Sequence, residues 1–342
     1  MVRVGLAGLG FMGGTHAQCH NALPNSTLAA VCDLEEDRRS KFAEMYGAQA
    51  FASFEEMLAS DIDMVDICLP TYEHRKAVEA AAAAKKHVLC EKPMSLTAAD
   101  CESMIAATKK AGVKFMVGHV IRFWPEYQVV KEILDSGRLG KINWVSATRM
   151  SPPPTWSWKE WLFDPKLSGG AVLDLHIHDL DFLAWILGPP KSLYASGVKT
   201  KKGGLDSVFT TLTGHAGGPV AFAEGSLAMA GEFPFTMGLK VNLEGGSIEL
   251  NSRLSPSLLV TPAGGGVEYP EVPQPEVPSV GSAGSAGNIE ALGGYFTEVQ
   301  YFVNCVDNDE APQTVTPEEA KLAVELCVAA TESMESGKLA EL

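Results

Sequence analysis

The sequence predicts an α/β protein with an N-terminal doubly wound parallel sheet and a C-terminal α/β domain that contains a large, mostly antiparallel, open sheet. Three observations predict this fold class. Short apolar runs alternate with helical stretches up to about residue 118, closely spaced strand patterns follow residue 190, and the length of 342 residues suits about two domains. We therefore expect one domain over residues 1–120 and a second over residues 121–342.

The N-terminal part alternates strand and helix patterns. Apolar runs predict strands over residues 2–7, 28–32, 64–69, 87–90 and 114–117. Runs of good helix formers predict helices over residues 38–46, 77–85 and 98–111. Strands that alternate with helices in this way favour a parallel, doubly wound sheet.

The pattern changes after about residue 120. Helices are predicted over residues 125–136 and 170–187, and strands over 142–150, 193–198, 208–214, 220–228, 236–243 and 246–251. Successive strands without intervening helices favour antiparallel pairing. The Pro-, Gly- and Ser-rich stretch 262–287 predicts a loop excursion. Helices over 291–304 and 317–336 close the chain, and Thr316 is the predicted N-cap of the second, with Pro317 at its first position.

Composition excludes several classes of partner. The formal net charge is −15, which repels phosphate backbones and anionic headgroups, so we expect neither nucleic acid nor membrane as a partner. The sequence shows no apolar run of about 18 residues and no secretory signal pattern. The seven cysteines are odd in number and form no C-x-x-C pair, so we expect a reduced, cytoplasmic protein without a structural metal.

A glycine-rich turn carries the first functional signal. Gly8-Leu9-Gly10-Phe11-Met12-Gly13 follows the first predicted strand and precedes a helix, as a dinucleotide-binding turn requires. Asp33 ends the second strand about 20 residues later, where a carboxylate binds a ribose 2′-hydroxyl. This predicts a dinucleotide site and favours NAD, because a 2′-phosphate would be repelled by Asp33. Arg38 and Arg39 leave NADP possible as the cofactor, because they could fold back over its adenosine end. Their simpler interpretation is as solvated charges on a helix.

Glu91-Lys92-Pro93 follows the strand predicted over 87–90 and therefore lies at the carboxyl end of that strand, where doubly wound sheets bind ligands. A lysine there can hold a substrate hydroxyl or carbonyl as a point charge, and the adjacent proline can fix the backbone, sometimes in cis. From these three residues alone, a surface loop lysine before a turn proline is the default interpretation.

A second candidate group lies in the helix predicted over 170–187. Asp174 and His178 are four residues apart and would share one helix face, so His178 can move a proton while Asp174 binds substrate or orients the imidazole. A rival interpretation makes His176 and His178 metal ligands together with Asp179 or Asp181. Helix periodicity places the two histidines on different faces, so no metal is predicted.

All six tryptophans fall between residues 124 and 185. Trp156, Trp158 and Trp161 lie in a stretch that opens with three prolines at 152–154. Their rings can stack on the apolar face of a sugar, but they suit core or interface anchors equally well.

Taken together, these features resemble the glucose-fructose oxidoreductase, inositol dehydrogenase and rhizopine catabolism family (Gfo/Idh/MocA). The resemblance covers nearly the whole chain and rests on the stretches 8–13, 70–74, 88–93, 118–123, 169–179, 268–270 and 332–337. It implies a Rossmann domain joined to an α/β domain whose open sheet forms homodimers or homotetramers. It also implies NAD- or NADP-dependent oxidation of a secondary alcohol on a sugar or cyclitol, or the reverse reaction.

The resemblance also implies roles for residues at matching positions. Lys92 would bind the reacting oxygen, His178 would be the general acid/base, and Asp174 would hold substrate and assist His178. The residues expected at the cofactor are Gly8, Gly10, Phe11, Met12, Gly13, Asp33, Arg38, Leu69, Thr71, His74, Glu91 and Lys92. Those expected at the substrate are Lys92, His119, Arg122, Trp161, Asp174 and His178.

Two other functions stay open. A glycosidase can use tightly bound NAD for transient oxidation and produce no net NADH. A non-catalytic NAD-binding regulator would be expected to lack the lysine or the histidine, and both are present here.

Overall fold

The computed structural model describes residues 1–199, 207–276 and 292–342. The chain divides into two compact units. Unit 1 contains Met1–Phe123, Trp156–Lys159 and Pro275–Lys321, and unit 2 contains Trp124–Thr155, Glu160–Gln274 and Leu322–Leu342. This division differs from the one predicted at residue 120 because two later segments group with the N-terminal unit.

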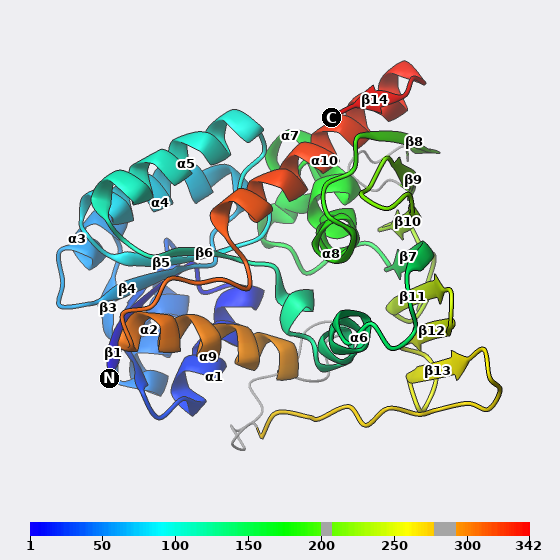
Figure 1. Cartoon of the computed structure of the whole chain (residues 1–342). Helices are drawn as coiled ribbons and strands as arrows, with labels where there is room; N and C mark the ends of the chain where they lie inside the picture. Colours follow the sequence, from blue (N-terminus) through cyan, green and yellow to red (C-terminus); the bar gives the residue numbers. More distant parts are fainter. Residues whose placement is uncertain (200–206, 277–291) are drawn as a thin grey trace. The chain divides into compact units, whose positions relative to one another are not determined.

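Unit 1 is built on a parallel sheet with the strand order β3-β2-β1-β4-β5-β6 (Figure 1). Its strands are β1 Val2–Ala7, β2 Ser26–Cys32, β3 Gln49–Phe51, β4 Met64–Ile67, β5 His87–Glu91 and β6 Phe115–Gly118. The order changes direction between β1 and β4, which creates the switch point at which doubly wound sheets bind ligands. The predicted parallel sheet is therefore confirmed.

Helices connect these strands. They are α1 Phe11–Ala22, α2 Glu36–Tyr46, α3 Phe54–Leu58, α4 Thr71–Ala83 and α5 Ala98–Ala111, and α9 Gly293–Asp307 joins unit 1 from late in the sequence. Helices α4 and α5 pack against each other, and α1 packs against α9. Short α-helical crossovers between parallel strands produce this doubly wound arrangement.

The strands of unit 1 are apolar because both faces of the sheet are covered. Val4 of β1 pairs with Leu28 of β2 and Met64 of β4, and all three side chains are buried. Strand β4 is buried along its whole length, yet it contains the charged residue Asp66, which is 0% exposed. A charge in that position requires partners inside the fold.

Unit 2 contains a sheet with the order β13-β12-β11-β7-β10-β9-β8-β14. Its strands are β7 Ile142–Met150, β8 Ser192–Val198, β9 Ser207–Thr213, β10 Val220–Ser226, β11 Thr236–Leu243, β12 Gly246–Asn251, β13 Leu258–Pro262 and β14 Ala340–Glu341. Strands β7 and β10 pair in parallel and the other neighbours are antiparallel. The expected mostly antiparallel sheet is confirmed, and β13 and β14 were not predicted.

The remaining helical elements are η1 Val120–Phe123, α6 Pro125–Asp135, η2 Trp158–Phe163, α7 Pro165–Ser168, η3 Val172–His176, α8 Ile177–Leu187 and α10 Pro317–Ser336. The predicted start of α10 is confirmed: Thr316 Oγ1 accepts from the Glu319 amide at 3.3 Å, and Glu319 Oε2 accepts from the Thr316 amide at 2.9 Å. Residues 277–287 of the predicted loop excursion and residue 291 of the predicted helix lie outside the described residues.

The sheet of unit 2 has two different faces. Alternate residues such as Leu193, Leu212 and Ala221 are buried, whereas their neighbours point outward. Phe222 lies opposite Thr211 of β9, which in turn lies opposite Tyr194 of β8, and Phe222 and Tyr194 are 44% and 43% exposed. The outward face therefore carries exposed aromatic side chains on β8 and β10.

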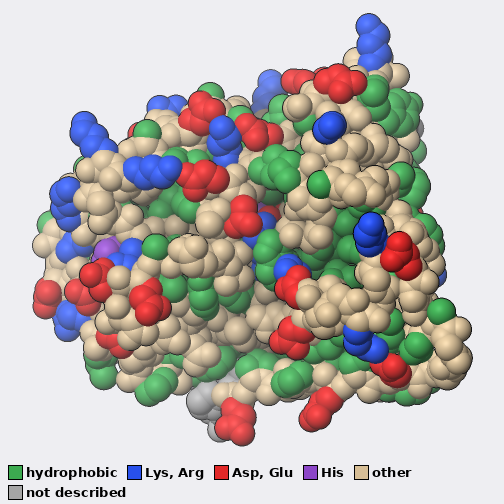
Figure 2. Space-filling model, in the orientation of Figure 1, with side chains coloured by type: hydrophobic (Ala, Val, Ile, Leu, Met, Phe, Trp, Pro, Cys, Tyr) green, Lys and Arg blue, Asp and Glu red, His purple; other side chains and the backbone are tan. Residues whose placement is uncertain are grey.

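No helix in the described ranges is long and apolar enough to cross a membrane. On the face drawn in Figure 2, acidic and basic side chains are interspersed rather than gathered by sign.

Candidate active site

The three glycines of the turn after β1 have different surroundings. Gly8 has φ +86°, and a Cβ atom there would lie 2.5 Å from the Cys68 carbonyl oxygen. A Cβ on Gly13 would lie 1.9 Å from the Gly8 carbonyl oxygen. A Cβ on Gly10 would have no atom of the described residues within 4 Å. Packing thus requires Gly8 and Gly13, while the backbone at Gly10 is open to a ligand such as a pyrophosphate.

Asp33 holds the turn from the end of β2. Its carboxylate accepts hydrogen bonds of 2.8 Å from the amides of both Leu9 and Glu35. Arg39 folds back and donates to the main-chain oxygens of Asp33 and Leu34 at 3.3 and 3.1 Å. Arg38 is half-buried on α2. The carboxylate is therefore placed beside the turn, and its contact with a ribose stays a prediction.

An aromatic segment lies beside the same turn. The rings of Phe11 and Trp156 are 4.8 Å apart, and Trp158 Nε1 donates to Glu35 Oε1 at 3.3 Å. Both tryptophans belong to unit 1, whereas Trp161, half-buried, belongs to unit 2. Trp156 and Trp158 thus contact Phe11 and Glu35, beside the glycine turn. The substrate role of Trp161 stays a prediction.

His74 connects two loops at the carboxyl edge of the sheet. Its Nδ1 lies 2.9 Å from the Pro93 carbonyl oxygen and its Nε2 lies 2.8 Å from that of Leu69. The side chain is 1% exposed, and Thr71 at the start of α4 is also buried. His74 therefore ties the loop after β4 to the loop that carries Lys92, which is a positioning role beside the predicted cofactor contact.

Glu91-Lys92-Pro93 follows β5 directly, and the Lys92–Pro93 peptide is cis. Glu91 Oε2 accepts from the Lys92 amide at 2.9 Å, and its Oε1 lies 3.1 Å from His16 Nε2. Lys92 is half-buried. The Glu91 carboxylate is thus engaged inside unit 1.

His16, Asp66 and Glu298 form a buried group that the sequence patterns did not predict. His16 Nδ1 lies 2.8 Å from Asp66 Oδ2, and Glu298 on α9 is 0% exposed. Asp66 was the available signal, since it is a charged residue in an otherwise apolar strand. Sequence alone does not tell which helix faces that strand.

His119 and Arg122 are both buried. Arg122 Nη1 donates to the Thr314 carbonyl at 2.9 Å and lies 3.2 Å from Glu319 Oε1. These contacts hold η1 to the start of α10 within unit 1. A substrate role for either residue remains a prediction.

Asp174 and His178 lie in unit 2. The predicted uniform helix is instead a π-helical turn, η3, followed by α8, so Asp174 and His178 do not share the regular α-helical spacing that the sequence implied. His178 is 9% exposed and Asp174 is half-buried. Single-turn π-helices are frequent at functional sites.

Asp179 and His176, two residues of the alternative metal site, form hydrogen bonds with other side chains of unit 2. Asp179 accepts two hydrogen bonds from Arg149, at 2.9 and 3.0 Å. His176 Nε2 lies 2.9 Å from Thr210 Oγ1, and burial followed by Arg149 lowers the pKa of His176 to about 3. Across the described residues, the ligand atoms that cluster within 4.8 Å belong instead to His16, Asp66 and Cys68. Burial raises the pKa of the Cys68 thiol, which disfavours the thiolate that binds metals.

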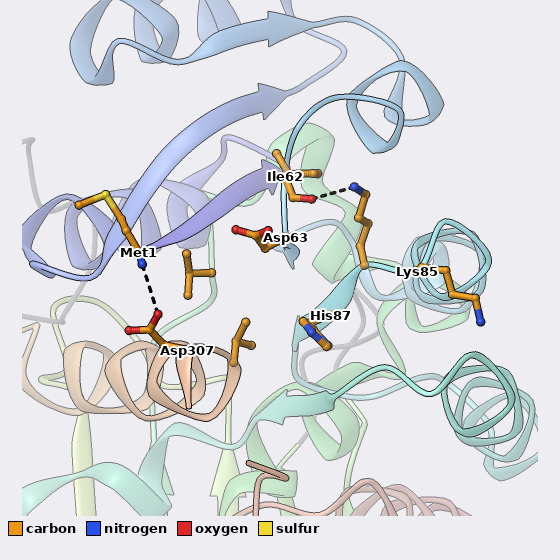
Figure 3. A pocket seen from close by; sticks show the side chains of 9 residues that line it. Met1, Ile62, Asp63, Lys85, His87 and Asp307 are labelled. Atoms are coloured by element: carbon orange, nitrogen blue, oxygen red, sulfur yellow. Dashed lines mark hydrogen bonds and ion pairs between the residues drawn. The ribbon is translucent and has the colours of Figure 1, made fainter. Parts of the chain in front are cut away.

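A surface pocket lies at the opposite edge of the unit 1 sheet (Figure 3). It is lined by residues at the amino ends of β1, β4 and β5, and the Met1 amino group lies 3.3 Å from Asp307 Oδ1. The glycine turn and Lys92 lie at the carboxyl ends of these strands, so the pocket is not part of the candidate active site.

Comparisons with known proteins match the sequence and fold of the chain. Residues 2–119 match "Oxidoreductase family, NAD-binding Rossmann fold", and residues 127–249 match "GFO/IDH/MocA C-terminal domain". Myo-inositol 2-dehydrogenase of Thermotoga maritima is 36% identical over 199 residues, which span 57% of this chain and 58% of that protein. D-xylose 1-dehydrogenase (NADP(+)) 2 of Haloferax volcanii is 29% identical over 317 residues, 92% of this chain and 91% of that protein.

A crystal structure of a probable dehydrogenase from Thermotoga maritima superposes with a TM-score of 0.83 at 28% identity, and covers 99% of this chain and 98% of that one. The two family matches cover most of the chain and include residues of both units. The chain belongs to the GFO/IDH/MocA family of oxidoreductases and contains its NAD-binding Rossmann domain.

Proposed function

We propose that the protein is an NAD-dependent dehydrogenase or reductase that transfers a hydride between nicotinamide and a secondary alcohol carbon of a sugar, inositol or related polyol. One observation carries the proposal. The open backbone at Gly10 and the Lys92 loop follow β1 and β5, at the carboxyl edge of one doubly wound sheet. The relatives named as myo-inositol 2-dehydrogenase and D-xylose 1-dehydrogenase support a polyol or sugar substrate.

The residues of the turn fit a dinucleotide. Gly10 leaves room for a pyrophosphate, and the first amides of α1 would donate to it. Asp33, which accepts from the Leu9 amide beside the turn, would accept from a ribose hydroxyl. When NAD is bound, its nicotinamide ring supplies the hydride acceptor. Asp33 favours NAD, and Arg38 and Arg39 leave NADP as the alternative.

The chain's own residues supply the proton chemistry. An alcohol carbon releases a hydride only as its hydroxyl loses a proton, so a base must stand beside the hydroxyl. In the proposed site Lys92 holds the reacting oxygen as a point charge, His178 accepts the proton, and Asp174 holds the substrate and orients His178. In the reverse direction His178 donates the proton to the forming alcohol.

The direct test is a panel of sugars, inositols and amino sugars with NAD and with NADP, in which formation of the reduced cofactor is followed by absorbance. We expect reduction with at least one of them and a strong loss in a Lys92→Ala variant. Lys110→Ala removes an exposed lysine from the last turn of α5 and serves as the matched control. Unchanged turnover in Lys92→Ala would remove Lys92 from the site. No reduction with any member of the panel would favour the glycosidase or the regulator.

We also propose that the outward face of the unit 2 sheet pairs with a second copy of the chain. The side chains that carry this proposal are large, apolar and between 39% and 46% exposed: Trp144, Tyr194, Phe209 and Phe222. Apolar side chains gathered on one sheet face are typical of protein–protein interfaces.

A further inference from the structure

A chain of buried polar groups lies beneath the loop that carries Lys92. It is formed by residues of unit 1 from four elements: His16 of α1, Asp66 of β4, Glu91 of β5 and Glu298 of α9. None of these residues is more than 6% exposed. Charged groups this deep in a fold need compensation, so their protonation states can be deduced from their contacts.

His16 lies between two carboxylates. Its Nδ1 is 2.8 Å from Asp66 Oδ2 and its Nε2 is 3.1 Å from Glu91 Oε1. A neutral imidazole has only one N–H, so only the imidazolium donates to both carboxylates. Burial would lower the pKa of His16, but the charge of Asp66 and the hydrogen bond to it raise that pKa well above its ordinary value.

The other titratable groups near His16 leave it protonated. They include the thiols of Cys19 and Cys68, the carboxyl of Glu298 and the phenol of Tyr295, whose ring centroid lies 6.2 Å from that of His16. Burial raises the pKa of both thiols, that of Cys19 to about 12, so they stay protonated. Burial and the neighbouring Glu91 raise the pKa of Glu298 well above its usual range. Neither carboxyl oxygen of Glu298 has a hydrogen-bond partner among the described residues, as suits a neutral acid.

Glu91 transmits the position of His16 to the loop. One oxygen of its carboxylate faces His16 and the other accepts from the Lys92 amide at 2.9 Å. The place where the Lys92 backbone leaves β5 is therefore fixed from α1.

We propose that His16 is a positioning residue for Lys92: as an imidazolium held between Asp66 and Glu91, it fixes the Glu91 carboxylate that in turn fixes the Lys92 amide and directs its side chain. This inference rests on the proposed role of Lys92 at the substrate. His16 itself lies inside unit 1 and acts on the reacting atoms only through Glu91 and Lys92.

The test compares His16→Gln with His20→Gln. His20 lies one turn further along α1, and its Nε2 lies 2.9 Å from the same Asp66 oxygen while its Nδ1 lies 2.9 Å from Ser26 Oγ. Both ring nitrogens of His20 are thus engaged away from Glu91, so His20 is a matched control for loss of a buried histidine at Asp66. With the best substrate of the panel, we expect His16→Gln to lower kcat by roughly 10- to 100-fold, as misplacement of a catalytic group does, with NADH affinity retained. We expect His20→Gln to keep kcat. Equal losses in the two variants would overturn the inference.

Glu91→Gln provides a second variant should His16→Gln fail to fold. Its amide oxygen still accepts from Lys92, and its NH₂ group can donate to Nε2 of a neutral His16. We therefore expect the ratio of Glu91→Gln turnover to wild-type turnover to be highest at high pH and to fall as the pH falls and His16 becomes protonated, a fall that His20→Gln does not show. A Glu91→Gln profile parallel to the wild-type profile would contradict the proposal.

A readout without substrate separates this inference from the proposed function. The rate at which a small acylating reagent modifies Lys92 is measured against pH by mass spectrometry, with Lys110 as the internal reference. We expect Lys92 reactivity to change in His16→Gln and not in His20→Gln. If Lys92→Ala leaves turnover intact while this pattern holds, the proposed function fails and the positioning role stands. If Lys92 reactivity is unchanged in His16→Gln, the positioning role fails.

Discussion

The three glycines of the turn after β1 have two different roles: packing of the fold requires Gly8 and Gly13, and space for a ligand requires Gly10. Gly8 and Gly13 have main-chain oxygens within 2.5 Å of their missing Cβ atoms, whereas Gly10 has open space. Gly10 also has an extended backbone, with φ −78° and ψ −151°, so its φ lies outside the positive range that favours glycine. The pair Gly10 and Gly13 therefore separates binding from folding.

Gly10→Ala should leave stability almost unchanged and weaken NADH binding by at least about tenfold, because the added methyl occupies the space expected for pyrophosphate. Gly13→Ala should lower stability by several kcal/mol, since its methyl meets a main-chain oxygen. Thermal melts and fluorescence titration with NADH measure the two effects. Wild-type NADH affinity in Gly10→Ala would show that the turn does not hold the cofactor.

The residues that can be named from sequence are those in local patterns. The glycine turn, Asp33 and the Glu91-Lys92-Pro93 stretch each follow an apolar strand, so their place at the carboxyl edge can be predicted. The His16 and Glu298 contacts cannot, because they depend on α1 and α9 packing against strands that are far apart in the sequence. The burial of Arg122 against Thr314 and Glu319 could not be predicted for the same reason, because these residues are far apart in the sequence.

Among the elements, those with caps or strong periodicity match their predictions best. Helix α5 has the predicted bounds, with Thr97 Oγ1 accepting from the Asp100 amide at its start and Gly112 in the left-handed region at its end. Strand β3 has three residues, of which two are exposed, so it lacks an apolar pattern. The π-helical turn η3 has no sequence pattern that separates it from α8, and it packs against β10.

The π-helical turn carries a prediction about acid stability. The pKa of His176 falls from 6.5 to about 3 in the folded protein, first through burial and then through Arg149. Between these values the unfolded chain binds a proton that the folded chain does not, so His176 makes stability decrease as the pH falls from 6.5 toward 3. The slope per group approaches about 1.4 kcal/mol per pH unit.

His176→Asn removes this titration. Compared with the wild type, the variant should show a shallower loss of unfolding free energy over that acid range, whatever its stability at neutral pH. Urea denaturation at a series of pH values provides the measurement. Identical slopes in the two proteins would mean that His176 binds its proton as readily in the folded chain as in the unfolded chain.

For the whole molecule, the predicted order of the two architectures along the chain is correct, but the division into units is not a single cut. The segments Trp156–Lys159 and Pro275–Lys321 group with unit 1. Strand periodicity cannot reveal this return of the chain, because it depends on tertiary packing and not on local pattern. The net charge of −15 repels an anionic pyrophosphate at long range. The amides of the turn and of the start of α1 must therefore bind it locally.

Self-association through the unit 2 sheet is the prediction that belongs to the whole molecule. Phe209→Glu combined with Phe222→Glu places two charges on the outward face and should reduce a dimer or tetramer to smaller species, as measured by analytical ultracentrifugation. Leu254→Glu, at a residue that is 51% exposed beyond β12, is the control and should leave the assembly intact. A wild-type protein that is monomeric throughout would rule out the proposed interface.

Turnover by His178→Ala addresses the proposed chemistry itself. With the best substrate of the panel and saturating NAD, the variant should bind NADH as the wild type does and reduce NAD roughly 100- to 10,000-fold more slowly at neutral pH, because positioned proton transfer contributes a factor of that size. Turnover equal to that of the wild type would contradict the assignment of His178 as the acid/base, and with it the proposed mechanism.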